Sequence, residues 1–372
     1  MILLVFLLGA AFCLYTLFGY PLLLDLLARR PHPVKKAFEP RTVSVLLPVR
    51  NGARWIGAKL ENLLALDYPP ELMEILVISD GSMDSTDRIV EQYLGRGNVR
   101  YVRIPASGKA VALNAALKQA RGEILFLTDV RQALSRDSLR NLVACFADPS
   151  VGVASGELII RNGGTTEEDN VGLYWRYEKW IRSRLSAIDS VPGATGCIYA
   201  MRRELAVPLP PGTLADDMYL PLAAFLRGYR VILDGSAQAF DYPTSLEKEF
   251  HRKVRTLAGV YQIMHFYPAL LGPGNRMWLH FVSHKLARLL LPWVMLLVAA
   301  CSFALPHPLR EIALAGQGLF YAVAILDSIV PEGTWLKRLT APVRTFVVLM
   351  AAALCAVAVL FFGAERLWKT AS

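Results

Sequence analysis

The chain has 372 residues, of which 54% are hydrophobic and 19% are charged, and its formal net charge at pH 7 is +9. This length allows two structural units, and the apolar excess is too large for an ordinary soluble enzyme. A positive balance can indicate nucleic-acid binding, but basic clusters beside apolar segments, which attract anionic lipid headgroups, explain it here, so we expect membrane lipids and no nucleic acid as partners.

The first 24 residues form an uncharged apolar segment. Its length is enough to cross a bilayer as a helix. No basic residue precedes it and no small-x-small cleavage site follows it, so we favour a retained transmembrane anchor over residues 1–27 and not a signal peptide.

Three further apolar segments, at residues 289–309, 312–330 and 345–364, predict a transmembrane region of about three spans over residues 278–372. The middle segment contains Asp327, so a re-entrant or interfacial helix is the alternative there. Basic residues follow the first span and separate the last two spans, and the positive-inside rule places both loops in the cytoplasm. This orientation predicts a multi-pass protein of the cell inner or plasma membrane, with its middle part in the cytoplasm.

The sequence pattern of the middle part, residues 28–245, predicts an α/β domain. Four short apolar runs alternate with helical patterns, at residues 43–47, 75–78, 99–102 and 123–127. This alternation indicates a mostly parallel, doubly wound sheet with helices on both faces. Pro48 is expected to stop the first strand. The charged segment that follows the domain predicts interfacial amphipathic helices over residues 246–277.

Polar side chains stand where two of these strands end. Asp80 follows the second strand, in the crevice where α/β sheets bind ligands, and suits a nucleotide's ribose or base; the alternative is a capped turn. Asp129 follows the fourth strand and is the candidate ligand of a hard divalent cation, since Mg²⁺ takes one or two carboxylates together with substrate phosphates. Lys109 opens a helix after Gly108 and suits a phosphate, with an exposed lysine as the alternative.

Three other stretches carry candidate chemistry. Asp216 and Asp217 open a helix, where they are either caps or a pair in which one carboxylate acts as a base, because an adjacent carboxylate raises the pKa. Trp175 lies among aromatic residues of a long helix and can stack on a sugar ring or make core or membrane contacts. The arginines of residues 251–255 suit a lipid phosphate or a leaving diphosphate.

The order of these motifs resembles the family 2 glycosyltransferases, which are inverting enzymes of the GT-A fold that use nucleotide-diphosphate sugars. Six motifs carry the resemblance: Pro48–Asn51, Asp80–Ser82, Gly108–Asn114, Asp129, Gly196–Arg203 and Asp216–Asp217. The flanking apolar segments resemble the membrane-embedded branch that includes cellulose, chitin, hyaluronan and poly-N-acetylglucosamine synthases. The resemblance implies sugar transfer to a growing polysaccharide at the cytoplasmic face, with coupling to export left open. The alternatives are transfer of a single sugar to a lipid-linked acceptor and a non-catalytic nucleotide-binding membrane regulator.

The resemblance also implies roles for single residues. Asp217 would be the catalytic base, and Asp129 would bind Mg²⁺ or Mn²⁺. The implied donor-binding residues are Pro48, Arg50, Asp80, Lys109, Asn114, Arg252 and Arg255. The implied acceptor-binding residues are Gly196, Cys197 and Asp216, to which the aromatic pattern adds Trp175.

Three positions depart from the family's motifs. Arg131 replaces the second acid of the metal motif, so the coordination of the cation is in question, and this arginine could instead contact phosphate directly. Asp216 replaces the longer acid before the base. Thr256 stands where the Gln-x-x-Arg-Trp motif has tryptophan, which weakens the case for a processive polymerase.

Overall fold

The computed structural model describes residues 1–160, 166–242 and 245–362. The chain divides into two compact units. The sheet unit consists of Arg30–Arg161 and Arg182–Asp241, and the helical unit consists of Met1–Arg29, Asn162–Ile181 and Tyr242–Ser372. The long helix α7 (Thr166–Ile188) contributes residues to both units.

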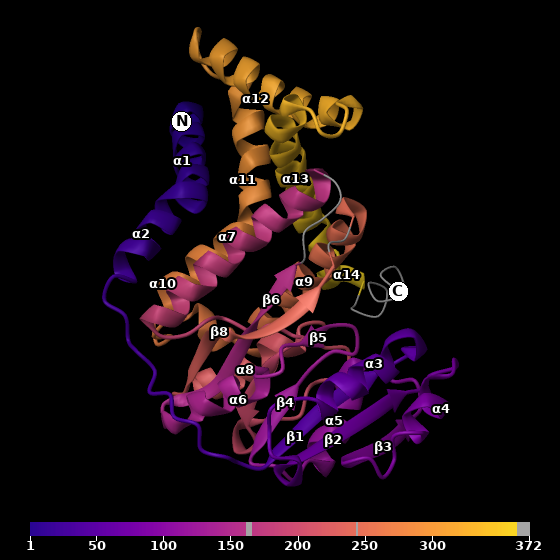
Figure 1. Ribbon diagram of the computed structural model, residues 1–372. Coiled ribbons are helices and arrows are strands. Elements are labelled where there is room, and N and C mark those ends of the chain that lie inside the picture. The colour runs from indigo at the N-terminus through magenta and orange to yellow at the C-terminus, as the bar shows by residue number, and fades with distance from the viewer. Residues whose placement is uncertain (161–165, 243–244, 363–372) are drawn as a thin grey trace. The chain divides into compact units, whose positions relative to one another are not determined.

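Within the described residues, the sheet unit contains an eight-stranded mixed sheet with the order β3-β2-β1-β4-β7-β6-β8-β5. The neighbouring strands β3, β2, β1 and β4 are parallel, and so are β6 and β8, whereas β7 is antiparallel to both β4 and β6 and β5 is antiparallel to β8. Their bounds are β1 Val43–Val49, β2 Met73–Asp80, β3 Asn98–Ile104, β4 Ile124–Leu127, β5 Ala133–Leu134, β6 Val151–Ile160, β7 Tyr199–Arg202 and β8 Arg230–Asp241 (Figure 1). The predicted mostly parallel α/β sheet is therefore confirmed.

Helices cover both faces of this sheet. Their bounds are α3 Ala53–Leu64, α4 Thr86–Glu91, α5 Lys109–Gln119, α6 Ser138–Ala144 and α8 Asp216–Leu226. Alternate residues of the strands, such as Val45 and Leu47 of β1, join α3 and α6 in one buried cluster. The strand residues between these, such as Leu46, are also buried but do not belong to that cluster. Helix α5 packs on β1 and β2, and α8 packs on β6 and β8. A period of two along a strand directs neighbouring side chains to opposite faces, which is why the parallel strands are apolar throughout.

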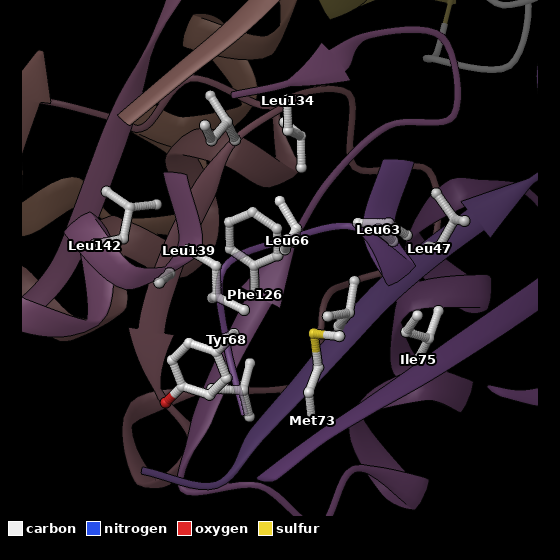
Figure 2. Close-up of a cluster of buried hydrophobic side chains, with 14 of the residues drawn as sticks. Leu47, Leu63, Leu66, Tyr68, Met73, Ile75, Phe126, Leu134, Leu139 and Leu142 are labelled. Atoms are coloured by element: carbon white, nitrogen blue, oxygen red, sulfur yellow. The ribbon is translucent and has the colours of Figure 1, made fainter. Parts of the chain in front are cut away.

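The buried cluster of the first face brings together side chains from strands, helices and connecting loops. Figure 2 labels ten of its members: Leu47, Leu63, Leu66, Tyr68, Met73, Ile75, Phe126, Leu134, Leu139 and Leu142. Phe126 of β4 is fully buried in this cluster. This packing holds the carboxyl ends of β1, β2 and β4 in place, from which the candidate site residues extend.

The prediction that Pro48 ends the first strand was wrong. The strand β1 continues to Val49, and Pro48 pairs in register with Ile78 of β2. On its other side, β1 pairs with β4 only as far as Leu46. Pro48 therefore lies beyond that ladder, where a residue without an N–H group removes no hydrogen bond.

The helical unit contains, among the described residues, four helical segments long and apolar enough to cross a membrane: Ile2–Leu27, Trp278–Ser302, Leu309–Ile329 and Trp335–Phe362. These comprise α1 (Ile2–Leu14) and α2 (Tyr20–Leu27), α10 (Trp278–Phe281) and α11 (Ala287–Ser302), α12 (Leu309–Leu326), and α13 (Trp335–Ala356) and α14 (Val359–Phe362). The amphipathic helix predicted after the sheet is α9 (Leu246–Phe266). The last predicted span extends to residue 364, beyond the described residues. These segments make the chain a membrane protein.

Asp327 is the carboxylate for which a re-entrant or interfacial helix was the alternative in the third segment. In the structure, neighbouring side chains pair with this carboxylate. Its carboxylate lies 3.1 Å from Lys337 Nζ and accepts a hydrogen bond of 2.5 Å from the Thr340 hydroxyl. Arg344 lies 3.6 Å from the same carboxylate. Asp327 and Lys337 are both buried, so the carboxylate is an internal partner of the next helix and not a charge exposed to lipid.

Candidate functional site

The candidate site lies in the sheet unit, at the carboxyl ends of its parallel strands. The strand order runs from β3 to β1 and then continues with β4, so the connection through α5 crosses to the opposite face. Ligands of α/β sheets bind where the order reverses in this way. A Cβ atom placed on Gly52, in the loop after β1, would lie 3.6 Å from the Val130 side chain. The loops that follow β1 and β4 therefore approach each other at this point.

Asp80 fixes the turn that precedes α5. Its Oδ1 accepts a hydrogen bond of 2.6 Å from the Ser107 amide, and its Oδ2 accepts one of 2.9 Å from the Gly108 amide. Gly108 has a φ of +90°, a conformation open to glycine. Asp80 thus positions the start of α5. The capped-turn alternative concerned the helix that follows Asp80, where the Asp84 carboxylate accepts a hydrogen bond of 3.0 Å from the Thr86 amide. The contact of Asp80 with a nucleoside remains a prediction.

Lys109 is the first residue of α5, and its ammonium lies between two carboxylates. Its Nζ is 3.0 Å from Asp129 Oδ1 and 3.1 Å from Asp216 Oδ2. Burial opposes the charged form of Lys109, but Asp129, Asp216 and Asp217 outweigh burial, and its pKa is raised above the ordinary value. The structure therefore brings together three residues that the sequence places far apart, with the ammonium charged.

Asp217, the predicted base, lies partly buried beside Gly196. A Cβ atom on Gly196 would lie 3.0 Å from Asp217 Oδ2. Burial and the neighbouring charge of Asp216 raise the pKa of Asp217 to about 6, against the opposing influence of Lys109. A carboxylate with this pKa is mostly ionised at neutral pH and holds a proton more tightly than an ordinary aspartate.

Arg182, which the sequence analysis did not single out, holds the loop around Gly196. Its guanidinium donates hydrogen bonds of 2.9 Å to the Thr195 hydroxyl and 3.1 Å to the Gly193 carbonyl. The Ala194 amide in the same loop donates to the Asp217 carbonyl at 2.7 Å. Arg182 also favours the ionised form of Asp217. An arginine on a helical pattern gives no local signal of this role.

Lys59 of α3 is a second residue that the sequence analysis missed. Its Nζ donates hydrogen bonds of 2.8 Å to the Thr128 hydroxyl and 2.7 Å to the Gln132 carbonyl, so it spans the loop that carries Asp129. The side chain is buried, and burial lowers the pKa of Lys59 to about 8. A signal was present, since this lysine falls on the apolar face between Ile56 and Leu63, where a cation needs a buried partner.

Two predicted binding residues have other roles in the structure. Cys197 is buried in the hydrophobic cluster, with the pKa of its thiol raised to about 12 by burial, and its carbonyl accepts a hydrogen bond from Thr128. The thiol therefore packs in the core, and the place of Cys197 near an acceptor stays a prediction. The Asn114 amide pairs in both directions with the Leu209 backbone, at 2.8 Å each way. Asn114 thus joins α5 to a loop, and its contact with the sugar donor stays a prediction.

Arg131, which replaces the second acid of the metal motif, pairs with Asp241 at the end of β8. Gln132 donates a hydrogen bond of 2.9 Å to the same Asp241 oxygen. The Arg131 side chain is 44% exposed and reaches Asp241 through one of its nitrogens, so its contact with a phosphate stays a prediction. Two other residues of this unit were predicted to bind the sugar donor. Pro48 is partly exposed, and Arg50 is exposed in the loop that follows β1.

Trp175, Arg252 and Arg255 belong to the helical unit, so their roles at the site remain predictions. Within that unit, the guanidinium of Arg252 lies 4.6 Å from the centre of the Trp175 ring, and the Lys253 ammonium lies 5.2 Å from it. Arg252 also pairs with Glu249. The Trp175 ring therefore packs against two cations of α9, which favours a structural role for it over sugar stacking.

The residues around Asp129 suit a divalent cation. The Asp129 side chain is 38% exposed, and a cation, the Lys109 ammonium, already lies against it. No group of three or more His, Cys, Asp or Glu side chains in the described part of the chain is arranged to hold a metal. Because Mg²⁺ and its relatives take one or two carboxylates and complete their shell with water and substrate phosphates, the residues suit a cation shared with a bound diphosphate.

Comparisons with known families place the chain among sugar-transferring proteins. The model described as "Glycosyl transferase family 2" matches residues 44–207, and that of "Glycosyl transferase family group 2" matches residues 129–362. A beta-monoglucosyldiacylglycerol synthase of Synechocystis is 25% identical over 79% of this chain. A poly-beta-1,6-N-acetyl-D-glucosamine synthase of Staphylococcus aureus is 24% identical over 60% of it. The chain spans 65% and 55% of the length of these two relatives.

A solved structure is similar over nearly the whole chain. It is the mannosyltransferase PcManGT from Pyrobaculum calidifontis in complex with GDP-Man and Mn²⁺, with a TM-score of 0.74 and 25% sequence identity. The match covers 97% of this chain and 100% of that one. The fold of the sheet unit is thus the GT-A fold.

Proposed function

The chain belongs to glycosyl transferase family group 2, and on that premise we propose that it moves a sugar from a nucleotide-diphosphate sugar to a polysaccharide or lipid acceptor at a membrane. The main support for this proposal is that a candidate base and a cation lie in the same site. Asp217, with its pKa raised to about 6, stands beside Gly196, and the Lys109 ammonium lies between Asp129 and Asp216. The relatives' names, which include glycolipid and polysaccharide synthases, support both classes of acceptor.

The reaction is a single displacement at the anomeric carbon. An acceptor hydroxyl oxygen forms the new bond to that carbon as the bond to the diphosphate oxygen breaks, and the electron pair leaves with the nucleoside diphosphate. Asp217 takes the proton of the attacking hydroxyl, while the Lys109 ammonium stabilises the departing negative charge. A carboxylate base acting opposite the leaving group is the arrangement of inverting enzymes.

A divalent cation at Asp129 would neutralise charge on the diphosphate. The Mn²⁺ in the similar mannosyltransferase structure supports such an ion, and Mg²⁺ is the alternative. Asp129 is the residue that would hold it, with the diphosphate completing the shell. Arg255 of α9 is retained as a further candidate for the leaving diphosphate.

The acceptor divides the proposal into two forms. A growing polysaccharide is the first, supported by the poly-N-acetylglucosamine synthases among the relatives. A lipid acceptor that receives one sugar is the second, supported by the glycolipid synthase that aligns with more of this chain and by Thr256 in place of the motif's tryptophan. The length of the products made by the purified protein separates the two forms.

The arrangement in the membrane follows from charge and hydropathy. We infer a multi-pass protein of the plasma membrane with a cytoplasmic sheet unit, because a basic cluster follows the first apolar segment. The second basic cluster, Lys337, Arg338 and Arg344, lies within the first turns of α13 and not in the loop before it, and Lys337 there pairs with Asp327. Access of a reporter dye to single cysteines introduced after α2 and before α13, in sealed vesicles of known orientation, tests the inference. Labelling of the loop between α12 and α13 from the outer side would contradict it.

The activity is tested by release of nucleoside diphosphate from the detergent-purified chain. The donors are GDP-mannose, UDP-glucose and UDP-N-acetylglucosamine, with Mn²⁺ or Mg²⁺ and with membrane lipids or oligosaccharides as acceptors. We expect release with one donor that depends on an acceptor and leaves labelled sugar on it. If nucleotides bind but no donor releases diphosphate with any acceptor, the chain is instead a nucleotide-binding regulator.

The pH dependence of transfer should report Asp217. Its base function needs the ionised form, so a pKa of about 6 predicts a rate that rises between roughly pH 5 and pH 7 and is then level. Lys109 remains protonated over this range, because its pKa is raised. Arg182→Gln removes a cation that favours ionisation of Asp217, so the rising limb should move to higher pH. A rising limb at the same pH in both proteins would assign it to another group.

A pair of neighbouring substitutions tests the roles of the loop before β7. Gly196→Ala places a methyl group 3.0 Å from Asp217 Oδ2 and should lower transfer by about tenfold, since a displacement of the base of a few tenths of an ångström disturbs its alignment. Cys197→Ala removes only a buried thiol and should leave transfer within about twofold, with a loss of stability of about 1 kcal/mol. The initial rate and the thermal midpoint of each variant check this, and a larger loss of transfer from Cys197→Ala would indicate that the thiol acts at the acceptor site.

A further inference from the structure

The Lys109 ammonium lies against Asp129, the residue that would hold a divalent cation. Its Nζ lies at hydrogen-bonding distance from Asp129, the candidate metal ligand, and at a similar distance from Asp216. A metal ion bound to Asp129 would therefore meet an ammonium already in contact with that carboxylate. Two cations cannot share this carboxylate without another anion, because their repulsion in a partly buried site is large.

The backbone of Lys109 is held while its side chain can change partners. Asp80 binds the amides of Ser107 and Gly108, and Lys109 begins the helix that packs on β1 and β2. The lysine stem carries four rotatable bonds, and its ammonium is a point charge that bonds equally well to a carboxylate or a phosphate. The start of α5 is also a favourable place for a phosphate, since its free amides and dipole add to the ammonium.

The charges favour a concerted exchange. One ammonium against the carboxylates of Asp129, Asp216 and Asp217 leaves the group with about two net negative charges when Asp217 is ionised. Entry of a divalent cation alone would cancel that charge but place a second cation beside the ammonium, and entry of a diphosphate alone would add to the negative charge. Entry of both leaves the total unchanged, because a diphosphate diester carries about two negative charges at neutral pH. The neighbouring cations are engaged elsewhere, since Arg131 pairs with Asp241 and Lys59 bonds to Thr128 and Gln132.

We propose that Lys109 is an internal counter-ion that keeps a divalent cation off Asp129 until a nucleotide diphosphate takes over the ammonium. This inference rests on the proposed function, because the diphosphate is the donor's. It assigns to Lys109 a role before the reaction in addition to its role toward the leaving group. Metal and nucleotide then bind with positive coupling, and the metal alone binds weakly.

The test measures Mn²⁺ binding to the full-length protein in detergent by electron paramagnetic resonance of free Mn²⁺. Titrations are made with Mn²⁺ alone, with GDP and with UDP, each corrected by a protein-free titration at the same nucleotide concentration. In the wild type, we expect Mn²⁺ to bind about tenfold more tightly with the fitting nucleotide, within the usual range of coupling between two ligands. Equal Mn²⁺ affinity with and without both nucleotides would overturn the proposal, and this comparison needs no variant.

Substitutions in α5 test whether Lys109 causes the weak binding of Mn²⁺ alone. Lys109→Met keeps the stem but removes the charge, and should bind Mn²⁺ alone about tenfold more tightly than the wild type. Lys109→Arg restores a cation and should return to weak binding, and Lys118→Met, at the exposed end of the same helix, should match the wild type. Lys109→Met with unchanged affinity for Mn²⁺ alone and an unchanged thermal midpoint would overturn the proposal.

Failure of this inference is distinguishable from failure of the proposed function, because Mn²⁺ binding is measured without a donor sugar. Transfer of sugar together with uncoupled Mn²⁺ binding would contradict the role of Lys109 and leave the transferase intact. Coupled binding that Lys109→Met removes, in a protein that transfers no sugar from any donor, would support the role of Lys109 and contradict the transferase.

Discussion

Asp217→Asn is expected to lower the rate of sugar transfer by about 10²–10⁴-fold, the usual contribution of a general base. The substitution keeps the size of the side chain beside Gly196 but replaces a proton acceptor by an amide that cannot accept the proton of the acceptor hydroxyl. The pKa of about 6 makes Asp217 the carboxylate of this site that is suited to hold that proton during the reaction. The measurement is the initial rate of labelled product formation at pH 7.5, where the wild-type carboxylate is ionised.

The controls separate loss of the base from loss of the site. Asp67→Asn removes an exposed carboxylate that pairs with Arg140 on the surface of the sheet unit, and its rate should equal that of the wild type. Asp217→Asn should retain affinity for nucleotide and Mn²⁺, because these bind at Lys109 and Asp129 in our proposal. A rate above about one tenth of the wild-type value in Asp217→Asn would assign the base to another residue, with Asp216 the next to test.

Asp327→Leu is expected to lower the free energy of unfolding by about 3–5 kcal/mol, the usual cost of removing one partner of a buried ion pair. The Lys337 ammonium donates hydrogen bonds of 3.1 Å to the Asp327 carboxylate and 2.9 Å to its carbonyl, and the Lys337 side chain is only 4% exposed. Without the carboxylate, the buried ammonium keeps only the Asp327 carbonyl and Glu332, 3.6 Å away, and the Thr340 hydroxyl keeps only the Leu336 carbonyl, inside a segment that is apolar enough to cross a membrane. The thermal midpoint in detergent should therefore fall by several degrees.

The double variant Asp327→Leu with Lys337→Met is the matched control. It removes both charges, and replacing a buried pair by apolar side chains of similar size is often nearly neutral. We expect it to recover most of the stability lost by Asp327→Leu. A thermal midpoint of Asp327→Leu equal to that of the wild type would show that this pair contributes little, and would favour water access to the ammonium.

Local patterns in the sequence were enough to predict the order of strands and helices in the sheet unit. The apolar runs that became β1, β2, β3 and β4 are short and bounded by turn residues, and buried parallel strands have this pattern because both of their faces are covered. The carboxyl ends of parallel strands meet at one edge, so the sequence also indicated that Asp80 and Asp129 would lie near it. The four long apolar segments follow from length and hydropathy alone, since the bilayer sets both.

Only the tertiary structure decided which partner each polar side chain has. Arg131 pairs with Asp241, which is 110 residues away in the chain, and Asn114 pairs with the backbone of Leu209. The sequence could not distinguish Gly196 from its neighbour Cys197, although one lies against Asp217 and the other points into the core. The position of Lys109 between Asp129 and Asp216 likewise depends on how α5, β4 and α8 pack.

The physical reason lies in the range of the interactions. Secondary structure depends on the periodicity of apolar residues within a few helical turns or one strand length. This periodicity can be read from residues that are neighbours in the sequence. The partner of a charge depends on distances of a few ångströms between segments remote in the chain, because hydrogen bonds and ion pairs weaken within that range. The sequence alone therefore determined the kind of fold and the edge of the sheet that carries the chemistry. The packing of the sheet unit decided that a lysine, and not a second acid, stands beside the candidate metal ligand.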